Sequence, residues 1–139
     1  MERALAAEPV EAFPGSVRWV QHLRAEGVRT AVVSSSANAG DVLRAAGIDG
    51  LFETTVDGRD VVELGLNGKP APDGFLEAAR RLDVAPDRAI VVEDALAGVA
   101  AGRAGKFGLV VGVARNAAPD DLRSAGAHLV VEDLGEMLP

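Results

Sequence analysis

Short apolar runs alternate along most of this chain with segments whose apolar residues recur at helical spacing. The runs TAVV, AIVV and LVVGV contain no polar alternation, which is typical of strands buried on both faces of a sheet. A weaker run, ETTV, lies between the first two of these, and a last short run, LVV, follows the third. The pattern therefore predicts five strands, at Thr30–Val33, Glu53–Val56, Ala89–Val92, Leu109–Val113 and Leu129–Val131.

The intervening segments predict helices, the first capped by Ser16 and ended by Gly27, with Trp19 on its apolar face. Strands that alternate with helices favour right-handed crossovers and a parallel sheet covered on both faces. We therefore expect an α/β, doubly wound, Rossmann-like domain. Met1–Glu8 has the composition of the end of a helix, stopped by Pro9. The other helices are expected at Asn38–Ala46, Asp73–Leu82, Ala95–Ala104 and Asp120–Ala125, with one turn near Val61–Leu64.

Composition narrows the function classes. A length of 139 residues, 48% of them hydrophobic, suits one domain with a buried core. The absence of cysteine excludes disulfides and thiolate metal sites. A net charge of −7 argues against nucleic acid as a partner, because such proteins need basic surface. No apolar run approaches the ~20 residues of a membrane span, and we expect a cytoplasmic protein with no membrane partner.

Polar residues follow two of the expected strands, where doubly wound sheets bind ligands. Ser34, Ser35 and Ser36 end the first strand and precede a helix, so hydroxyls and free amides there would suit a phosphate dianion. Helix capping is the competing explanation for these serines. Glu93 and Asp94 end another strand, and adjacent carboxylates there suit Mg²⁺. The alternative for Asp94 is a helix cap.

Lys69 lies in the segment GKPAPD, whose two prolines restrict where its side chain points. A lysine held in this way can neutralise a phosphate or a carboxylate, although a solvated surface lysine is the usual case. Asp73 is better explained as a residue that stabilises the first turn of its helix. His22 and His128 are expected to be structural, and Gly98 and its neighbours to allow close helix–sheet packing.

Together these segments resemble the haloacid dehalogenase superfamily. VVSSSAN is similar to its second motif, GKPAPD to its third and VVEDALAGVAAGRAG to its fourth. The resemblance runs from about Phe13 to the C-terminus and is nearest to the β-phosphoglucomutase-like subgroup of sugar-phosphate phosphatases and mutases.

The resemblance implies a role for each site residue. Ser34 and the Ser35 amide would hold the transferring phosphoryl group, and Lys69 would neutralise it and the nucleophile. Asp94 would bind Mg²⁺, with Glu93 beside it. Ser36 and Asn38 would contact a second phosphate of the substrate. The mutases usually have a lysine where this chain has Ala37, which leaves a phosphatase equally plausible.

The family's first motif, DxDGxxxD, which supplies the attacking aspartate, has no match in this sequence. Asp57-Gly58 follows the serine motif instead of preceding it. We therefore expect residues 1–12 to be a remnant of a cap helix and its connector, and 13–139 to be a core without its nucleophile strand. That strand normally lies between the Thr30 and Ala89 strands. The chain would then pair these two strands directly, borrow a strand from a second copy, or be part of a larger molecule.

Three functional hypotheses follow. The first is a magnesium-dependent hydrolase of a small phosphate ester, such as a sugar phosphate, or a β-phosphoglucomutase-type isomerase, with this chain inactive alone. The second is a non-catalytic phosphate- or metal-binding module. The third is a phospho-acceptor receiver domain, which ranks last because Lys69 precedes the acidic pair here.

Overall fold

The computed structural model describes residues 4–7 and 14–139 of the chain. Its strands and helices alternate along the sequence, as the apolar pattern predicts. No helix in these two ranges is both long and apolar enough to cross a membrane. The elements are β1 (Ala4–Ala7), α1 (Pro14–Ala25), β2 (Arg29–Val33), α2 (Ala39–Ala45), η1 (Asp49–Leu51), β3 (Thr54–Val56), α3 (Gly58–Glu63), α4 (Asp73–Leu82), η2 (Pro86–Arg88), β4 (Ala89–Glu93), α5 (Leu96–Ala104), β5 (Leu109–Val113), α6 (Pro119–Ala125), β6 (Leu129–Val131) and η3 (Leu134–Met137).

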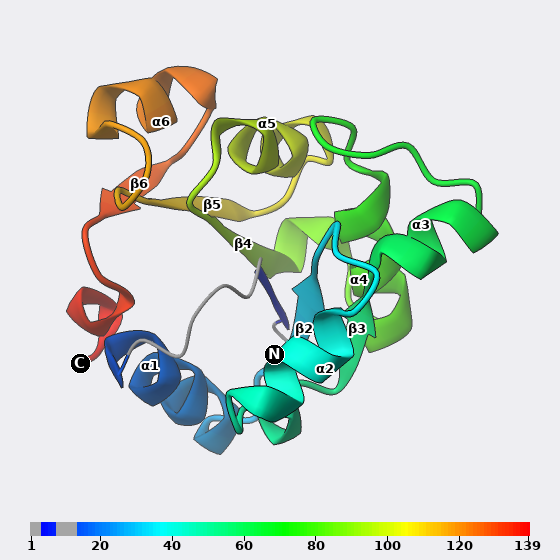
Figure 1. Cartoon of the computed structure of the whole chain (residues 1–139). Helices are drawn as coiled ribbons and strands as arrows, with labels where there is room; N and C mark the ends of the chain where they lie inside the picture. The colour runs from blue at the N-terminus through cyan, green and yellow to red at the C-terminus, as the bar shows by residue number, and fades with distance from the viewer. Residues whose placement is uncertain (1–3, 8–13) are drawn as a thin grey trace.

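All neighbouring strands are parallel, in the order β3-β2-β1-β4-β5-β6 (Figure 1). From β1 the chain adds strands first on one side and then, after α4, on the other. This reversal beside β1 is the topological switch point at which doubly wound sheets bind ligands. The expected doubly wound α/β fold is confirmed.

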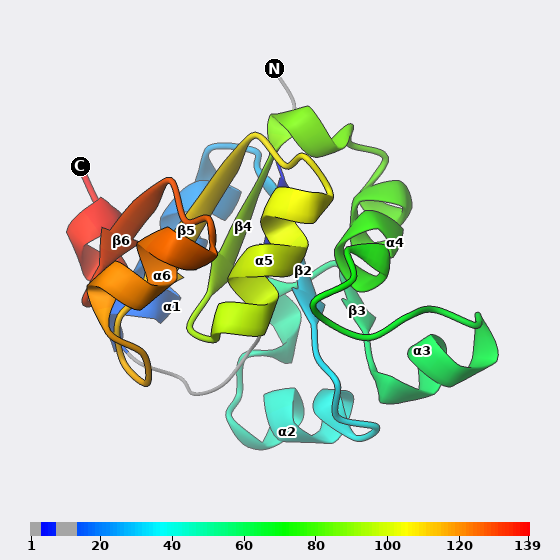
Figure 2. The ribbon, with the colours of Figure 1, turned by 90° about the horizontal axis from the view of Figure 1, so that it is seen from above.

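Helices cover both faces of the sheet. One face carries α4, α5 and α6, and the other carries α1 (Figure 2). Successive strand residues point to opposite faces, so Val91 and Val110 join the cluster under α4 and α5, whereas Val92 and Val111 pack with Trp19 of α1. Trp19 is therefore a core residue, as expected, at 3% exposure.

The centre of the sheet departs from the expectation. Residues 4–7 form a strand between β2 and β4, with Ala7 in register with Val32 on one side and Val92 on the other. The prediction of a helix end in Met1–Glu8 is thus wrong over residues 4–7, and its remaining residues lie outside the described ranges. Direct pairing of β2 with β4 is also wrong. Alanine favours helices, but a four-residue segment satisfies few of its own backbone groups as a helix, whereas a parallel ladder on each edge provides partners for them.

Smaller differences concern element ends. Helix α1 begins at Pro14 rather than at a Ser16 cap, because the fixed φ of proline suits a first helical position.

The ring nitrogen Nδ1 of His128 accepts a hydrogen bond from the amide of Val110 at 2.9 Å, so this histidine extends the backbone pairing of β5. Its structural role is confirmed.

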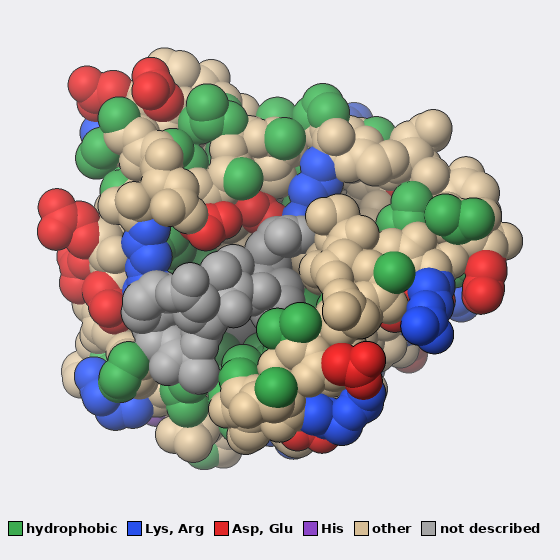
Figure 3. All heavy atoms as spheres, viewed as in Figure 1, with side chains coloured by type: hydrophobic (Ala, Val, Ile, Leu, Met, Phe, Trp, Pro, Cys, Tyr) green, Lys and Arg blue, Asp and Glu red, His purple; other side chains and the backbone are tan. Residues whose placement is uncertain are grey.

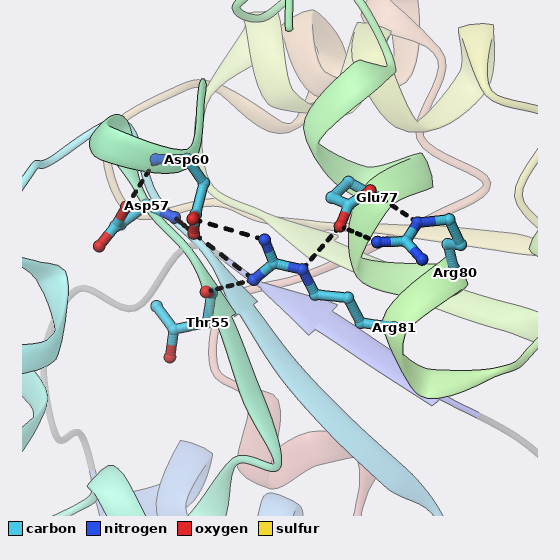
Figure 4. A network of polar contacts seen from close by, with 6 residues as sticks. All are labelled: Thr55, Asp57, Asp60, Glu77, Arg80 and Arg81. Atoms are coloured by element: carbon cyan, nitrogen blue, oxygen red, sulfur yellow. Dashed lines mark hydrogen bonds and ion pairs between the residues drawn. The ribbon is translucent and has the colours of Figure 1, made fainter. Parts of the chain in front are cut away.

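A network of charged side chains joins α4 to β3 and α3 (Figure 4). Glu77 lies between two arginines of its own helix, accepting from Arg80 at 2.7 and 2.8 Å and from Arg81 at 2.7 Å. The hydrogen bond from Arg80, with that from Arg81, lowers the pKa of Glu77 from 4.5 to about 2 and outweighs the opposing effect of burial. Glu77 is therefore ionised in the folded state at any ordinary pH.

This low pKa predicts an acid-dependent stability. The folded-state pKa lies below the unfolded value, so the stabilisation is complete above about pH 4.5 and is lost as the pH falls toward 2. Between pH 6 and pH 3, urea unfolding should show wild type losing on the order of 1 kcal/mol more than Glu77→Gln, since solvent around Arg80 screens the pair. Glu63→Gln, an exposed carboxylate of α3, should behave as wild type. Equal losses in wild type and Glu77→Gln would contradict the prediction.

Candidate phosphate and metal site

The predicted site residues lie at one edge of the sheet. Ser34 directly follows β2, and Glu93 is the last residue of β4. Because the strands are parallel, both positions lie at the carboxyl edge, with β1 between them, about 10 Å apart at two ladder spacings. On the face drawn in Figure 3, acidic and basic side chains meet near the centre, below α5.

Glu93 and Lys69 form an ion pair at this edge. Their Oε1 and Nζ atoms are 2.7 Å apart, and the side chains are 0% and 20% exposed respectively. The Lys69 ammonium also lies 4.8 Å from the ring centroid of Phe75, and Oε2 of Glu93 accepts from the amide of Ala95 at 3.4 Å. The interpretation of Lys69 as a solvated surface residue is therefore wrong. A buried carboxylate of this kind depends on its cation.

Gly98 gives the Glu93 side chain its space. A Cβ atom added to this buried glycine of α5 would overlap the carboxyl carbon and one carboxylate oxygen of Glu93. One turn on, a Cβ at Gly102 would lie 3.0 Å from Val110 and 3.1 Å from Val91. The predicted close packing of helix on sheet is confirmed, and at Gly98 it serves the site itself.

The loop that carries Lys69 is fastened at both ends of its GKPAPD segment. Oδ2 of Asp73 accepts hydrogen bonds from the amide and the side-chain nitrogen of Asn67, at 2.9 and 3.2 Å. Asp73 is also the first residue of α4. These bonds hold the chain on either side of Lys69 together, so Asp73 supports the site without lying in it.

Asp94 makes a contact that the sequence pattern did not reveal. Its Oδ2 atom accepts a hydrogen bond from Nδ2 of Asn116 at 3.1 Å. Helix α5 has Ala95 at its N-cap position and no side-chain cap, so the interpretation of Asp94 as a cap is wrong. Asn116 lies three residues beyond β5, and applying the strand-end rule to that strand as well would have found it.

The segment Ser34–Asn38, here called the serine loop, makes more internal hydrogen bonds than expected. The Ser36 amide donates to Ser34 Oγ at 3.1 Å, and the Asn38 amide donates to Ser36 Oγ at 3.3 Å. The Ser36 hydroxyl in turn donates a hydrogen bond to Asn38 Oδ1. These two amides are not free, contrary to expectation. The serines also do not cap α2. The N-cap residue of this helix is Asn38, and no side chain makes a capping hydrogen bond there. Ser34 itself is 9% exposed and directly follows β2 at the carboxyl edge.

Fold and site together define a class of protein. This is a doubly wound α/β domain with hydroxyls, a lysine and two carboxylates at the carboxyl edge of its parallel sheet, on both sides of the central strand. Within residues 4–7 and 14–139, no three carboxylates or imidazoles are grouped closely enough to enclose a metal ion by themselves.

The family follows from comparison with known proteins. A family model of the haloacid dehalogenase-like hydrolases matches residues 2–106, and the chain belongs to this family. This confirms the resemblance and contradicts the receiver-domain hypothesis. A β-phosphoglucomutase of Mycobacterium bovis is 48% identical over 99% of this chain and 54% of its own length. A trehalose-phosphate phosphatase of Mycobacterium leprae is 40% identical over 88% of this chain and 28% of its own length.

Solved structures agree with this result. A family hydrolase from Deinococcus radiodurans, whose crystal structure contains phosphate and sodium, superposes with a TM-score of 0.79 at 32% identity. That alignment covers 91% of this chain and 57% of the other. The chain thus spans about half the length of the curated β-phosphoglucomutase and of the solved structure that it matches.

Proposed function

We propose that the carboxyl edge of the sheet binds a phosphoryl group and a magnesium ion. An enzyme with this core would transfer phosphoryl groups to or from a small phosphate ester, such as a sugar phosphate. The observation that carries the proposal is the Lys69–Glu93 ion pair, 2.7 Å long and next to Asp94. A cation and carboxylates held together at a ligand-binding edge suit an oxyanion and its divalent counter-ion.

In this proposal the serine loop holds the phosphate. The Ser34 hydroxyl accepts from the Ser36 amide and can still donate its own hydrogen to a phosphoryl oxygen. The Ser35 amide would be a second donor, and Lys69 would supply the balancing charge. Ser36 and Asn38, at the exposed end of the loop, would contact a second phosphate.

The carboxylates present suit magnesium. Mg²⁺ usually takes one or two carboxylates and completes its shell with water and phosphate oxygens, so it needs no closed cage of side chains. Asp94, oriented by Asn116, would be a direct ligand, and Glu93 would lie beside it. When bound, the ion would neutralise charge on the phosphoryl oxygens. Lys69, paired with Glu93, would keep the local charge balanced.

The reaction type divides into two candidates. The identity of 48% to a protein named β-phosphoglucomutase favours an isomerase. The membership of a hydrolase family, the similarity to a trehalose-phosphate phosphatase and the alanine at position 37 favour a phosphatase. We propose the phosphatase, with the β-phosphoglucomutase-type isomerase as the second candidate, because Ala37 cannot supply the cation of the mutases.

This chain by itself should bind without turning substrate over. Its sequence contains no DxDGxxxD segment, so no aspartate in that pattern is available to form a covalent phosphoenzyme. The same observation favours the alternative of a non-catalytic phosphate- and metal-binding module. In both cases the segment that completes the site, whether from a longer chain or a second copy, would decide activity.

Calorimetric titration with inorganic phosphate in magnesium buffer tests the proposal. Wild type should bind phosphate in magnesium buffer and not in the same buffer without Mg²⁺. In a separate titration with Mg²⁺, Asp94→Asn should lower the affinity for the ion at least about tenfold. Asp120→Asn, an exposed carboxylate of α6, is the matched control and should bind as wild type. Neither protein should hydrolyse p-nitrophenyl phosphate. Failure of wild type to bind phosphate would refute the site, and hydrolysis abolished by Asp94→Asn would refute the predicted inactivity.

A further inference from the structure

Arg81 of α4 reaches across to two other elements (Figure 4). Its Nη1 atom donates to the carbonyl oxygen of Thr55 in β3 at 3.0 Å, and its Nη2 atom lies 3.4 Å from Oδ1 of Asp60 in α3. Its Nε atom donates to Glu77 in its own helix at 2.7 Å. The side chain is 24% exposed. One guanidinium therefore ties α4 to β3 and to the first turn of α3.

Asp60 is itself part of the first turn of α3. Its amide donates to Oδ1 of Asp57 at 3.0 Å, and its Oδ2 atom accepts from the amide of Asp57 at 3.1 Å. This reciprocal pair is a capping box, which fixes the conformation of the turn between the two residues. Holding the Asp60 carboxylate therefore holds the whole turn 57–60.

The serine loop rests on that turn. The amide of Gly58 donates to the carbonyl oxygen of Ser36 at 3.0 Å, and the amide of Ser34 donates to Val56 at 2.9 Å. The approach at Gly58 is so close that an added Cβ would lie 2.5 Å from the carbonyl oxygen of Ser35. A small displacement of the turn would therefore move the serine loop, because there is no free space between them.

We propose that Arg81 is a positioning residue, which holds the turn 57–60 against the Ser34–Ser36 loop and so sets the geometry of the phosphate donors. The part of the inference that concerns phosphate rests on the proposed function. The planar guanidinium serves three acceptors on three elements at once, whereas a lysine at the same place would keep the charge but could not span them. The chain of contacts runs from Arg81 to Asp60, through the capping box of the turn 57–60, and on to the carbonyl oxygen of Ser36.

Arg80 provides a matched control. It is the neighbouring arginine, it pairs with the same Glu77 and its side chain is 72% exposed. Its described contacts do not include Thr55 or Asp60. Arg80→Lys and Arg81→Lys therefore make the same chemical change next to the same carboxylate, and only the second removes the contacts to β3 and α3.

Amide hydrogen exchange, followed by NMR, tests the positioning role. In Arg81→Lys the Gly58 amide should exchange about tenfold faster than in wild type, as expected for a local opening, while the Val110 amide at the far side of the sheet is unchanged. Arg80→Lys should match wild type at both amides. In parallel, titration with inorganic phosphate in magnesium buffer should give an affinity about tenfold weaker for Arg81→Lys and unchanged for Arg80→Lys.

The outcomes separate this inference from the proposed function. An unchanged Gly58 amide in Arg81→Lys overturns the inference, and so does a parallel rise at Val110, which would mean a global loss of stability. If wild type binds no phosphate, the proposed function fails, while the exchange of Gly58 still decides whether Arg81 holds the turn. Faster exchange at Gly58 with unchanged phosphate affinity would refute the link to the phosphate donors.

Discussion

Replacing Lys69 with methionine should lower the free energy of unfolding by about 3 kcal/mol, the cost of leaving a buried carboxylate without its cation. Glu93 is 0% exposed in its side chain, so water cannot take the place of the ammonium 2.7 Å away. Methionine is only one atom shorter than lysine, so the loss reports on the missing charge, including the ammonium contact with the Phe75 ring, rather than on a large cavity. Urea unfolding at pH 7 gives the measurement.

A double-mutant cycle measures the interaction energy between Lys69 and Glu93. In the background of Glu93→Gln, which removes the buried charge, Lys69→Met should cost less than about 1 kcal/mol, because a neutral amide no longer needs a cation. Lys106→Met, at an exposed lysine, should change stability by no more than about 0.5 kcal/mol. Equal costs of Lys69→Met in the two backgrounds would show that the ion pair is not coupled.

Replacing Gly98 with alanine should cost about 2 kcal/mol, although alanine is the better helix former by about 1 kcal/mol. The added methyl group would occupy the place of the Glu93 carboxylate, and because this side chain is fully buried it would have to move. Moving Glu93 also separates it from Lys69. The same urea titration measures the loss, and weaker Mg²⁺ binding should accompany it.

Gly50→Ala is the control for this substitution. A Cβ at Gly50, in η1, would meet no atom within 4 Å, so alanine there should be neutral or slightly stabilising. The steric explanation predicts a second result. Glu93→Ala should lower the free energy of unfolding less in the Gly98→Ala background than in wild type, because the overlap is then already relieved. A stable Gly98→Ala protein with unchanged metal binding would disprove the position of Glu93.

The site could be predicted from the sequence as far as strand ends determine it. Ser34 and Glu93 end buried apolar runs, and parallel strands bring such positions to one edge without further information. The pairing of Lys69 with Glu93 could not be predicted, because 24 residues and a whole helix separate them and only the path of α4 brings the loop back. Asn116 lies three residues beyond the end of β5 rather than directly at it, so the strand-end rule marks it only when it is extended into that loop.

By itself, the sequence determined the class of fold, the order of its elements from α1 onward and the edge of the sheet at which the proposed site lies. These properties depend on local periodicity and on the geometry common to parallel sheets. The tertiary structure alone decided that residues 4–7 form the central strand, since the preference of alanine for helix gave way to ladders on both sides. It also decided which charge Lys69 balances and that Arg81 reaches the turn beneath the serine loop. Such choices depend on distances between segments remote in the chain, which only packing sets.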